Sequence, residues 1–340
     1  MGQMGPGNLR TEDSGDAATR ILTHLFRFRR SPQPPEPCQR QPCRTCFAVH
    51  RPKVDAFVQA GRPVEFVIAA FPAKSPNRRK TLGILPDLGE RLALEFLQSF
   101  CEQVTHYHPP GARITIASDG HVFGDLVGVS DEDVSAYHLE LKSIIDELGG
   151  SSLGVYSLSD AYGGSDYGKL RESLVAEHAT PLEKLHHLVR TDPDWRHLFD
   201  GMHRFMVEDQ VVLRPDASRT RIRRDCKDLA LQVIQRSNAW SSVVAQTFPA
   251  AIRLSIHPQP HHSAKIGVHM LRTRDAWLTP WHGTVLDDGQ RLTLVKRAEA
   301  ERLHATLAYR RGRPSHFVAP HLAPPVDELD RPTTLQEVSA

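Results

Sequence analysis

The sequence has no long apolar run and no excess of charge of one sign. None of its apolar stretches approaches the ~18 uninterrupted residues of a membrane-spanning helix, so we expect no membrane segment. The 42 Lys and Arg residues nearly balance the 40 Asp and Glu residues, whereas a nucleic-acid-binding protein usually carries a strongly basic face. The content of hydrophobic residues (40%) and charged residues (24%) is typical of a globular chain and excludes a collagen-like or wholly disordered one.

Cysteines are few, and no secretory signal is evident. The 5 cysteines are an odd number, and residues 1–20 lack a basic segment followed by an apolar run, so we expect reduced thiols in the cytoplasm. Cys38, Cys43 and Cys46 lie close together, and His50 follows them. This spacing suits a structural zinc ion, or the segment is a loop with unpaired thiols. Because no second Cys-x-x-Cys pair follows, we predict no metal ion.

Signatures of nucleotide binding are also missing. The sequence contains no Gly-x-Gly-x-x-Gly motif. The segment 163–169 resembles a Walker A loop, but Leu170 stands where a Ser or Thr would bind magnesium. We interpret this segment as a glycine-rich loop, and we expect no dinucleotide site.

Strand-like and helix-like patterns alternate in the first half of the chain. Residues 64–71 form a continuous apolar run, as expected of a buried parallel strand. Residues 86–104 carry an apolar stripe at i, i+4 spacing, and residues 113–118 form a second strand. A helix opened by a capping box follows at 130–148, and a third strand follows at 153–158. This alternation predicts a parallel sheet with right-handed crossovers.

The second half of the chain has a different pattern. It is largely helical from about residue 169 to 248, returns to a strand at 251–256, and continues with short strands around 266, 284 and 292. We therefore predict an α/β fold, with a Rossmann-like parallel-sheet N-terminal domain, a helical middle and a smaller mixed α+β C-terminal part. We expect a disordered proline-rich tail over 1–45, whose basic cluster at 26–30 lies in solvent. An α/β Rossmann-like domain with a helical extension should follow over 46–235. A smaller α+β substrate-binding part over 236–325 and a tail over 326–340 should complete the chain.

Ligands of open parallel sheets bind beyond the carboxyl ends of the strands, and the loop at 71–83 follows the first predicted strand. This loop combines cations with hydrogen-bonding side chains: Lys74, Ser75, Asn77, Arg78, Arg79, Lys80 and Thr81. Fixed positive charge with several converging donors suits a phosphate or a carboxylate. The alternative is an exposed basic loop, but the position after a buried strand favours an anion site.

A second loop, at 118–125, follows the second predicted strand. Asp119, His121 and Asp125 offer acid and base groups, and two glycines allow tight bends. Asp119 would hold an amine or a polyol, or it merely caps a turn. Both loops should meet at one edge of the sheet.

A third polar set lies near the C-terminus. Arg253, Ser255 and His257 alternate along one strand, so their side chains share a face that would line a polar cavity, or the strand is an edge strand with that face in water. Lys265 lies on a separate strand, and His282 closes the segment 279–282. We expect the other prominent histidines on the surface: His186, His187, His197, His261 and His262.

Five groups of residues occur in a fixed order along the chain. They are Phe71–Asn77 with Lys80, Gly83 and Pro86-Asp87; Ser118–Phe123 with Asp125; Arg236 with Asn238-Ala-Trp240; Ile252–His257; and Thr279–His282. Together they resemble the motifs of the isocyanide (isonitrile) synthase family, which includes pyoverdine and dityrosine biosynthesis proteins. The resemblance spans roughly residues 43–320.

The resemblance implies an enzyme that condenses an α-amino acid with ribulose 5-phosphate. The amino group would become an isonitrile whose carbon comes from the ketone carbon of the sugar. An aromatic amino acid, tyrosine or tryptophan, is the implied substrate, and neither a redox cofactor nor a metal ion is implied. An iron/2-oxoglutarate-dependent oxygenase would act next on the product. No nucleic-acid or membrane partner is expected.

The resemblance also implies roles for individual residues. We assign Lys74 and Lys80 to the phosphate, Arg253 to the amino-acid carboxylate, and His257 to general base catalysis. Asp119 and His282 are further proton-transfer candidates, and Lys74 alternatively forms a Schiff base with the ketose. The other predicted substrate-binding residues are Ser75, Asn77, His121, Asp125, Arg236, Ser255 and Lys265.

Two other functions remain open at this point. The same cationic loop would serve a different sugar-phosphate enzyme of the aldolase or isomerase kind, which needs no amino acid. It would also serve a non-catalytic module that binds a phosphate ligand.

Overall fold

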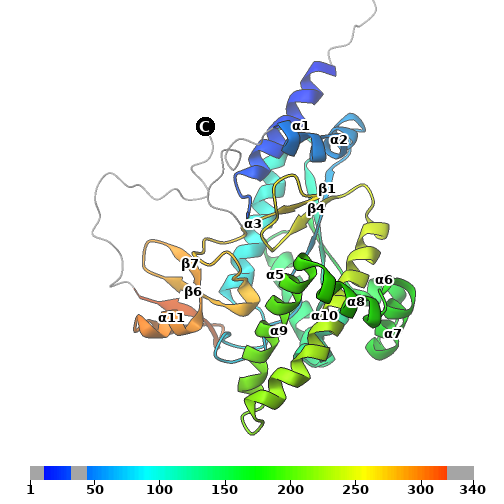
Figure 1. Ribbon diagram of the computed structural model, residues 1–340. Helices are drawn as coiled ribbons and strands as arrows, with labels where there is room; N and C mark the ends of the chain where they lie inside the picture. Colours follow the sequence, from blue (N-terminus) through cyan, green and yellow to red (C-terminus); the bar gives the residue numbers. More distant parts are fainter. Residues whose placement is uncertain (1–10, 32–43, 320–340) are drawn as a thin grey trace, which may run out of the picture.

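The computed structural model describes residues 11–31 and 44–319, and it confirms an α/β fold (Figure 1). Five strands form a parallel sheet in the order β3-β2-β1-β4-β5. Their bounds are β1 Val64–Ala69, β2 Ala112–Ala117, β3 Leu153–Tyr156, β4 Ile252–Ser255 and β5 Lys265–Gly267. The three predicted N-terminal strands are therefore present, and the strand predicted near the C-terminus lies beside β1 in the same sheet.

Helices cover both faces of this sheet. One face packs against α1 (Thr11–Phe26), α2 (Arg44–Gln59), α3 (Leu88–Val104) and α5 (Asp131–Glu147), and the large apolar core lies there. The other face packs against α4 (Gly120–Val127), α6 (Leu158–Tyr162), α7 (Tyr167–His178) and α10 (Arg219–Thr247). The alternation of side chains along β4 sends Leu254 into the large core and Arg253 toward α10.

The helical middle of the chain is confirmed. Between β3 and β4 the chain forms α6, α7, α8 (Leu182–Thr191), α9 (Pro193–Leu213) and α10. Because α10 is one continuous helix, and β4 and β5 pair in the main sheet, the structure does not divide at residue 236 as predicted. The main sheet therefore extends along the chain to β5.

A second, smaller sheet forms the C-terminal part. Its strands are β6 (Thr284–Asp287), β7 (Leu292–Val295), β8 (Thr306–Arg310) and β9 (Arg313–Val318), in the mixed order β7-β6-β9-β8. The short helices η1 (Pro280–His282) and α11 (Arg297–Arg302) flank it. Figure 1 shows this sheet beside α3, far from α6 and α7. The predicted smaller α+β part is thus present, with a later start.

The prediction of a disordered tail over residues 1–45 is wrong for the part that the structure describes. Helix α1 buries Ile21, Leu22, Leu25 and Phe26 in the large core, because its apolar residues fall on one stripe. Two of the three arginines in the basic cluster at 26–30, Arg29 and Arg30, are buried, whereas Arg27 is exposed. Arg30 is buried and donates hydrogen bonds to the carbonyls of Ile256 and Leu278, which lie far along the chain.

Several predictions concern residues outside the described ranges. The proline-rich segment after Ser31, Cys38, Cys43 and the predicted tail at 326–340 all lie there. Within the described ranges, no helix is both long enough and apolar enough to cross a membrane.

Candidate active site

A close backbone contact just after the carboxyl end of β1 positions the first candidate residue, Asp119. Phe71 takes a left-handed backbone conformation with φ of 56°, which is rare for an aromatic residue, and Pro72 follows it. The Pro72 carbonyl oxygen lies so close to Gly120 that a Cβ atom there would approach it to 2.1 Å. Only glycine fits at that position. The contact fixes the start of α4 and, with it, the neighbouring Asp119.

Asp119 has the chemistry of an acid or base at neutral pH. Burial raises the pKa of its carboxyl to about 7, and only its own backbone amide opposes the shift. The side chain does not cap α4, and no other side chain in the described residues bonds to it. Asp119 nevertheless keeps some exposed surface. A recessed, accessible carboxyl without a partner is the arrangement that a catalytic acid or base requires.

The neighbouring Ser118 contacts His138, a residue that the sequence did not single out. The Ser118 hydroxyl donates to the Phe71 carbonyl at 2.8 Å and lies 2.6 Å from His138 Nε2. Burial, with His121 and Lys142 nearby, lowers the pKa of His138 to about 3, so the ring is neutral. No pattern in the sequence distinguished His138, since it lies within a predicted helix beside buried residues.

Arg253 and Lys265 are two partly buried cations that have no carboxylate partner among the described residues. They are register partners on β4 and β5, so their side chains share the face toward α10. Arg253 donates to the Ser241 hydroxyl at 2.8 Å, and no side chain in the described ranges pairs with the Lys265 ammonium. Burial lowers the pKa of Arg253, and burial together with Arg253 lowers that of Lys265. Buried cations are usually paired, so this pair is suited to an anionic ligand.

Two neutral histidines lie near one another, and the first of them, His257, also lies near Lys265. Burial, Arg30 and Lys265 lower the pKa of His257 to about 4, although its side chain is exposed, so it is also recessed but accessible. Burial, Lys80 and His257 lower the pKa of His282 to about 3. His282 Nδ1 lies 3.0 Å from the Thr279 hydroxyl.

Asp119 and His257 follow β2 and β4, two strands apart in the sheet. At ordinary strand spacing, the ends of these two strands are about 10 Å apart. We call Asp119, Arg253, His257, Lys265 and His282 the strand-end site. Asp119 and His257 lie just beyond the carboxyl ends of β2 and β4, whereas Arg253 and Lys265 lie further back, near the start of β4 and β5. Lys265 and His282 are both close enough to His257 for their charges to interact with it. Trp277 lies beside the site with 59% of its surface exposed and its ring 5.9 Å from that of His257.

The cationic loop at 71–83 has a different arrangement from the one predicted. The Lys74 ammonium is fully buried and contacts Asp87 at 2.7 Å, Glu90 at 2.8 Å and the Pro280 carbonyl at 3.1 Å. Burial alone would lower the pKa of Lys74, but the two carboxylates raise it. Burial raises the pKa of Asp87 to about 7 even though Lys74 opposes the shift. This cluster ties the N-terminus of α3 to η1.

The other predicted residues of that loop converge on Asp209 of α9, which sequence reasoning missed. Ser75 donates to Asp209 at 3.2 Å, Asn77 at 2.9 Å, and the Lys80 ammonium lies 2.7 Å from it. Lys80 also approaches Glu208 at 3.4 Å. An acidic side chain from the helical insertion therefore neutralises the loop, while Arg78 and Arg79 point outward, exposed.

The remaining predicted residues are held by protein groups. Arg236 pairs with both oxygens of Asp125, at 2.7 and 2.9 Å, and so joins α10 to α4. His121 stacks on Tyr167 with ring centres 3.6 Å apart. The Ser255 hydroxyl accepts a hydrogen bond from the backbone of His257 and shapes the turn after β4. Ser255 therefore lies between Arg253 and His257 with its hydroxyl engaged by the backbone, whereas Arg236, Asp125 and His121 bind other protein groups.

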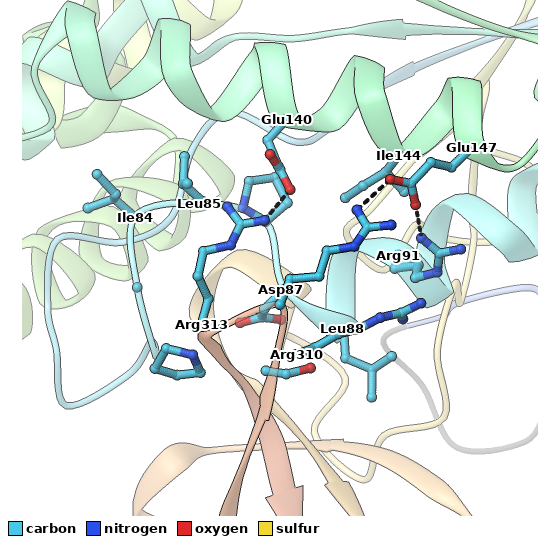
Figure 2. Close-up of a pocket in the computed structure, with 15 residues that line it drawn as sticks. Ile84, Leu85, Asp87, Leu88, Arg91, Glu140, Ile144, Glu147, Arg310 and Arg313 are labelled. Carbon is cyan, nitrogen blue, oxygen red and sulfur yellow. Dashed lines mark hydrogen bonds and ion pairs between the residues drawn. The ribbon is translucent and has the colours of Figure 1, made fainter.

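A separate surface pocket lies between the small sheet and helices α3 and α5 (Figure 2). Its arginines face glutamates: Arg91 and Arg311 pair with Glu147, at 2.8 and 2.6 Å, and Arg313 pairs with Glu140. Glu147 is shared by two of these arginines, and Arg310 also lines the pocket, so arginines outnumber the glutamates that pair with them.

Comparison with known proteins places the chain in a family. Residues 54–308 match the family of pyoverdine/dityrosine biosynthesis proteins. An L-tryptophan isonitrile synthase of Fischerella ambigua is 45% identical over 87% of this chain and 90% of its own length. An L-tyrosine isonitrile synthase of Pseudomonas aeruginosa is 41% identical over 88% of this chain and 94% of its own.

A solved structure agrees with the same assignment. The crystal structure of the PvcA protein from Pseudomonas aeruginosa superposes with a TM-score of 0.81 and 41% identity, over 89% of this chain and 99% of that one. The motifs recognised in the sequence, the fold and these relatives agree, and the chain therefore belongs to the pyoverdine/dityrosine biosynthesis family and, within it, to the isonitrile synthases.

Proposed function

We propose that the protein converts the α-amino group of an aromatic L-amino acid into an isonitrile, with ribulose 5-phosphate as the carbon donor. One observation carries this proposal: an unpaired acid/base, Asp119, follows β2, and two cations without a carboxylate, Arg253 and Lys265, lie side by side on β4 and β5 of the same sheet. A sugar phosphate and an amino acid together present the anionic groups and the amine that these side chains can bind.

Arg253 and Lys265 bind the phosphate in this proposal. A phosphate dianion would neutralise both cations and replace the water that burial removes from them. Lys74 and Lys80 were assigned to the phosphate from the sequence, but each has carboxylate partners at 2.7 Å. The proposal therefore moves the phosphate site from the 71–83 loop to β4 and β5.

Asp119 carries the proton transfers of the condensation. When the amine attacks the ketone carbon, a C–N bond forms, the nitrogen loses protons, and the ketone oxygen leaves as water. A carboxyl with a pKa of about 7 can accept the proton from nitrogen and return it to oxygen at neutral pH. His257 and His282 are neutral at that pH and can accept a hydrogen bond or a proton from the same intermediates.

The amino acid is L-tryptophan or L-tyrosine in this proposal. The relatives named above act on one or the other, and the exposed ring of Trp277 beside His257 offers a surface on which an aromatic side chain can stack. An oxygenase of the iron/2-oxoglutarate class would use the product.

The test is to incubate the protein with ribulose 5-phosphate and the twenty amino acids and to analyse the mixture by mass spectrometry. We expect one aromatic amino acid to gain a carbon and lose hydrogens. Consumption of the sugar phosphate without an amino acid would instead support an aldolase- or isomerase-like enzyme. Thermal stabilisation by ribulose 5-phosphate with no product from any amino acid would support a binding module and overturn the proposal.

A further inference from the structure

Three potential metal ligands from two distant segments meet beside the strand-end site. Cys46 lies on α2, and His261 and His262 lie in the loop between β4 and β5. Their ligand atoms all lie within 4.8 Å of one another. We propose that Cys46, His261 and His262 bind a zinc ion that clamps this loop to α2.

The donor set suits zinc. A thiolate and two imidazoles are common ligands of tetrahedral Zn²⁺, and three protein ligands leave one coordination position for water. Cys46 is buried, and the Arg29 guanidinium donates to its sulfur at 3.3 Å. His261 is half-buried and His262 is exposed, so the ion can enter from the solvent side.

The backbone at His262 supports a specific role for this residue. His262 has φ of 61°, a left-handed conformation that is strained for a non-glycine residue. Such strain persists where the surroundings hold the residue in place, and a metal–nitrogen bond is an interaction strong enough to offset it. Sequence reasoning had placed the His261-His262 pair among surface residues and had combined Cys46 with His50, which instead lies against Phe26.

Arg29 and Arg30 also hold the loop segment just before His261. Arg29 also donates to the Pro260 carbonyl at 3.2 Å, and the Arg30 carbonyl accepts a hydrogen bond from the Gln259 backbone at 3.1 Å. Contacts of this kind orient ligands before the metal binds.

The position of the cluster indicates a positioning role for the metal. The histidines lie between His257 and Lys265, so a bond to Cys46 would fix the loop that carries both of these side chains. This consequence depends on the proposed function, whereas metal binding itself does not. Loss of the ion should therefore weaken substrate binding without removing any group of the strand-end site.

Metal analysis tests the proposal on the full-length chain without a histidine tag. After incubation with zinc and gel filtration, we expect about one zinc per chain, and near zero in Cys46→Ser and His261→Ala. His262→Asn is a third variant that should lose the ion yet fold, because asparagine tolerates a positive φ. Cys101→Ala, at a buried cysteine of α3, and His197→Ala, at an exposed histidine of α9, are the matched controls and should keep the zinc.

Cobalt provides a spectroscopic readout that is independent of activity. In Co²⁺-loaded protein, we expect a thiolate-to-cobalt absorption band in the near ultraviolet that Cys46→Ser abolishes and His197→Ala leaves unchanged. A wild-type chain that retains no zinc and shows no such band would overturn the proposal. So would a zinc content that is the same in Cys46→Ser, His261→Ala and His262→Asn as in the wild type.

Discussion

Two basic regions belong to the main sheet, and they have opposite surroundings. The loop after β1 contains Lys74 and Lys80, which are held by Asp87, Glu90, Glu208 and Asp209. The strand pair β4–β5 presents Arg253 and Lys265, whose only hydrogen-bond partner from another side chain in the described residues is the neutral hydroxyl of Ser241.

The presence or absence of carboxylate partners distinguishes cations that stabilise the fold from cations that remain available to a ligand. A buried cation with carboxylate partners is already stabilised, and it links the elements that supply those partners. A cation that is partly desolvated and has no counter-charge costs free energy in the unliganded protein, and that cost is recovered when an anion binds. The two regions therefore predict different outcomes when their charges are removed.

The largest expected effect is a loss of turnover when Asp119, the proposed acid/base, is replaced. Asp119→Asn should reduce kcat by about 10²–10⁴-fold, because the amide can neither accept nor return a proton. Steady-state assays with both substrates measure this, and Asp228→Asn on the exposed side of α10 is the matched control. Thermal stability should stay the same or rise, since a desolvated carboxyl is removed. Turnover close to wild type would contradict the role of Asp119.

The next effect concerns the stability of the neutralised region. Lys74→Met should lower the free energy of unfolding by about 3–5 kcal/mol, because Asp87 and Glu90 would be left buried without their cation. Urea titration measures the change, and a second substitution, Asp87→Asn, should restore part of the loss. If Lys74→Met instead leaves stability unchanged and raises the KM for ribulose 5-phosphate, the contrast between the two regions fails.

The unpaired region should respond in substrate binding. Lys265→Met should raise the KM for ribulose 5-phosphate by about 10–100-fold, as expected when a hydrogen bond to a charged group is lost. Stability should stay the same or rise, because a desolvated ammonium without a counter-charge is removed. Lys227→Met, at an exposed position of α10, is the control. A rise in the KM for the amino acid alone would assign Arg253 and Lys265 to the carboxylate instead, as the sequence had suggested for Arg253.

The smallest expected effect is in the pH profile. If Asp119 must be ionised to accept the first proton, kcat/KM should be about tenfold lower at pH 6 than at pH 8, because its pKa is about 7. His257 and His282, with pKa values of about 4 and 3, should contribute nothing in this range. A flat profile between pH 6 and 8 would exclude Asp119 as the base of the rate-limiting step.

Much of the fold could be predicted because it is encoded locally. The apolar run at 64–71 and the capping box at Asp87–Glu90 determine β1 and the start of α3 without reference to the rest of the chain. Helix α1 was missed although Ile21, Leu22, Leu25 and Phe26 form a detectable stripe, because the proline-rich segment after it suggested a tail.

The site was predictable in part, for a related reason. Asp119, Arg253 and His257 could be chosen because strand ends and strand alternation are visible in sequence. The pairing of Lys80 with Asp209 could not, since the partner lies on a helix more than a hundred residues away whose docking depends on the whole fold. The type of a side chain indicates what it can bind, whereas its partners decide whether it is free to do so.

The strand order also has a consequence for how the protein is made. β4 lies next to β1 in the sheet, although the chain forms β2, β3 and the helices α6–α10 between them. During synthesis on the ribosome, β1 must therefore remain without its second neighbour until the helical insertion has been translated. Arg30, which binds the carbonyls of Ile256 and Leu278, also finds its partners only at that late stage. Arg253, His257 and Lys265 therefore join the sheet late in synthesis, and an arrested chain that ends before β4 would lack all three.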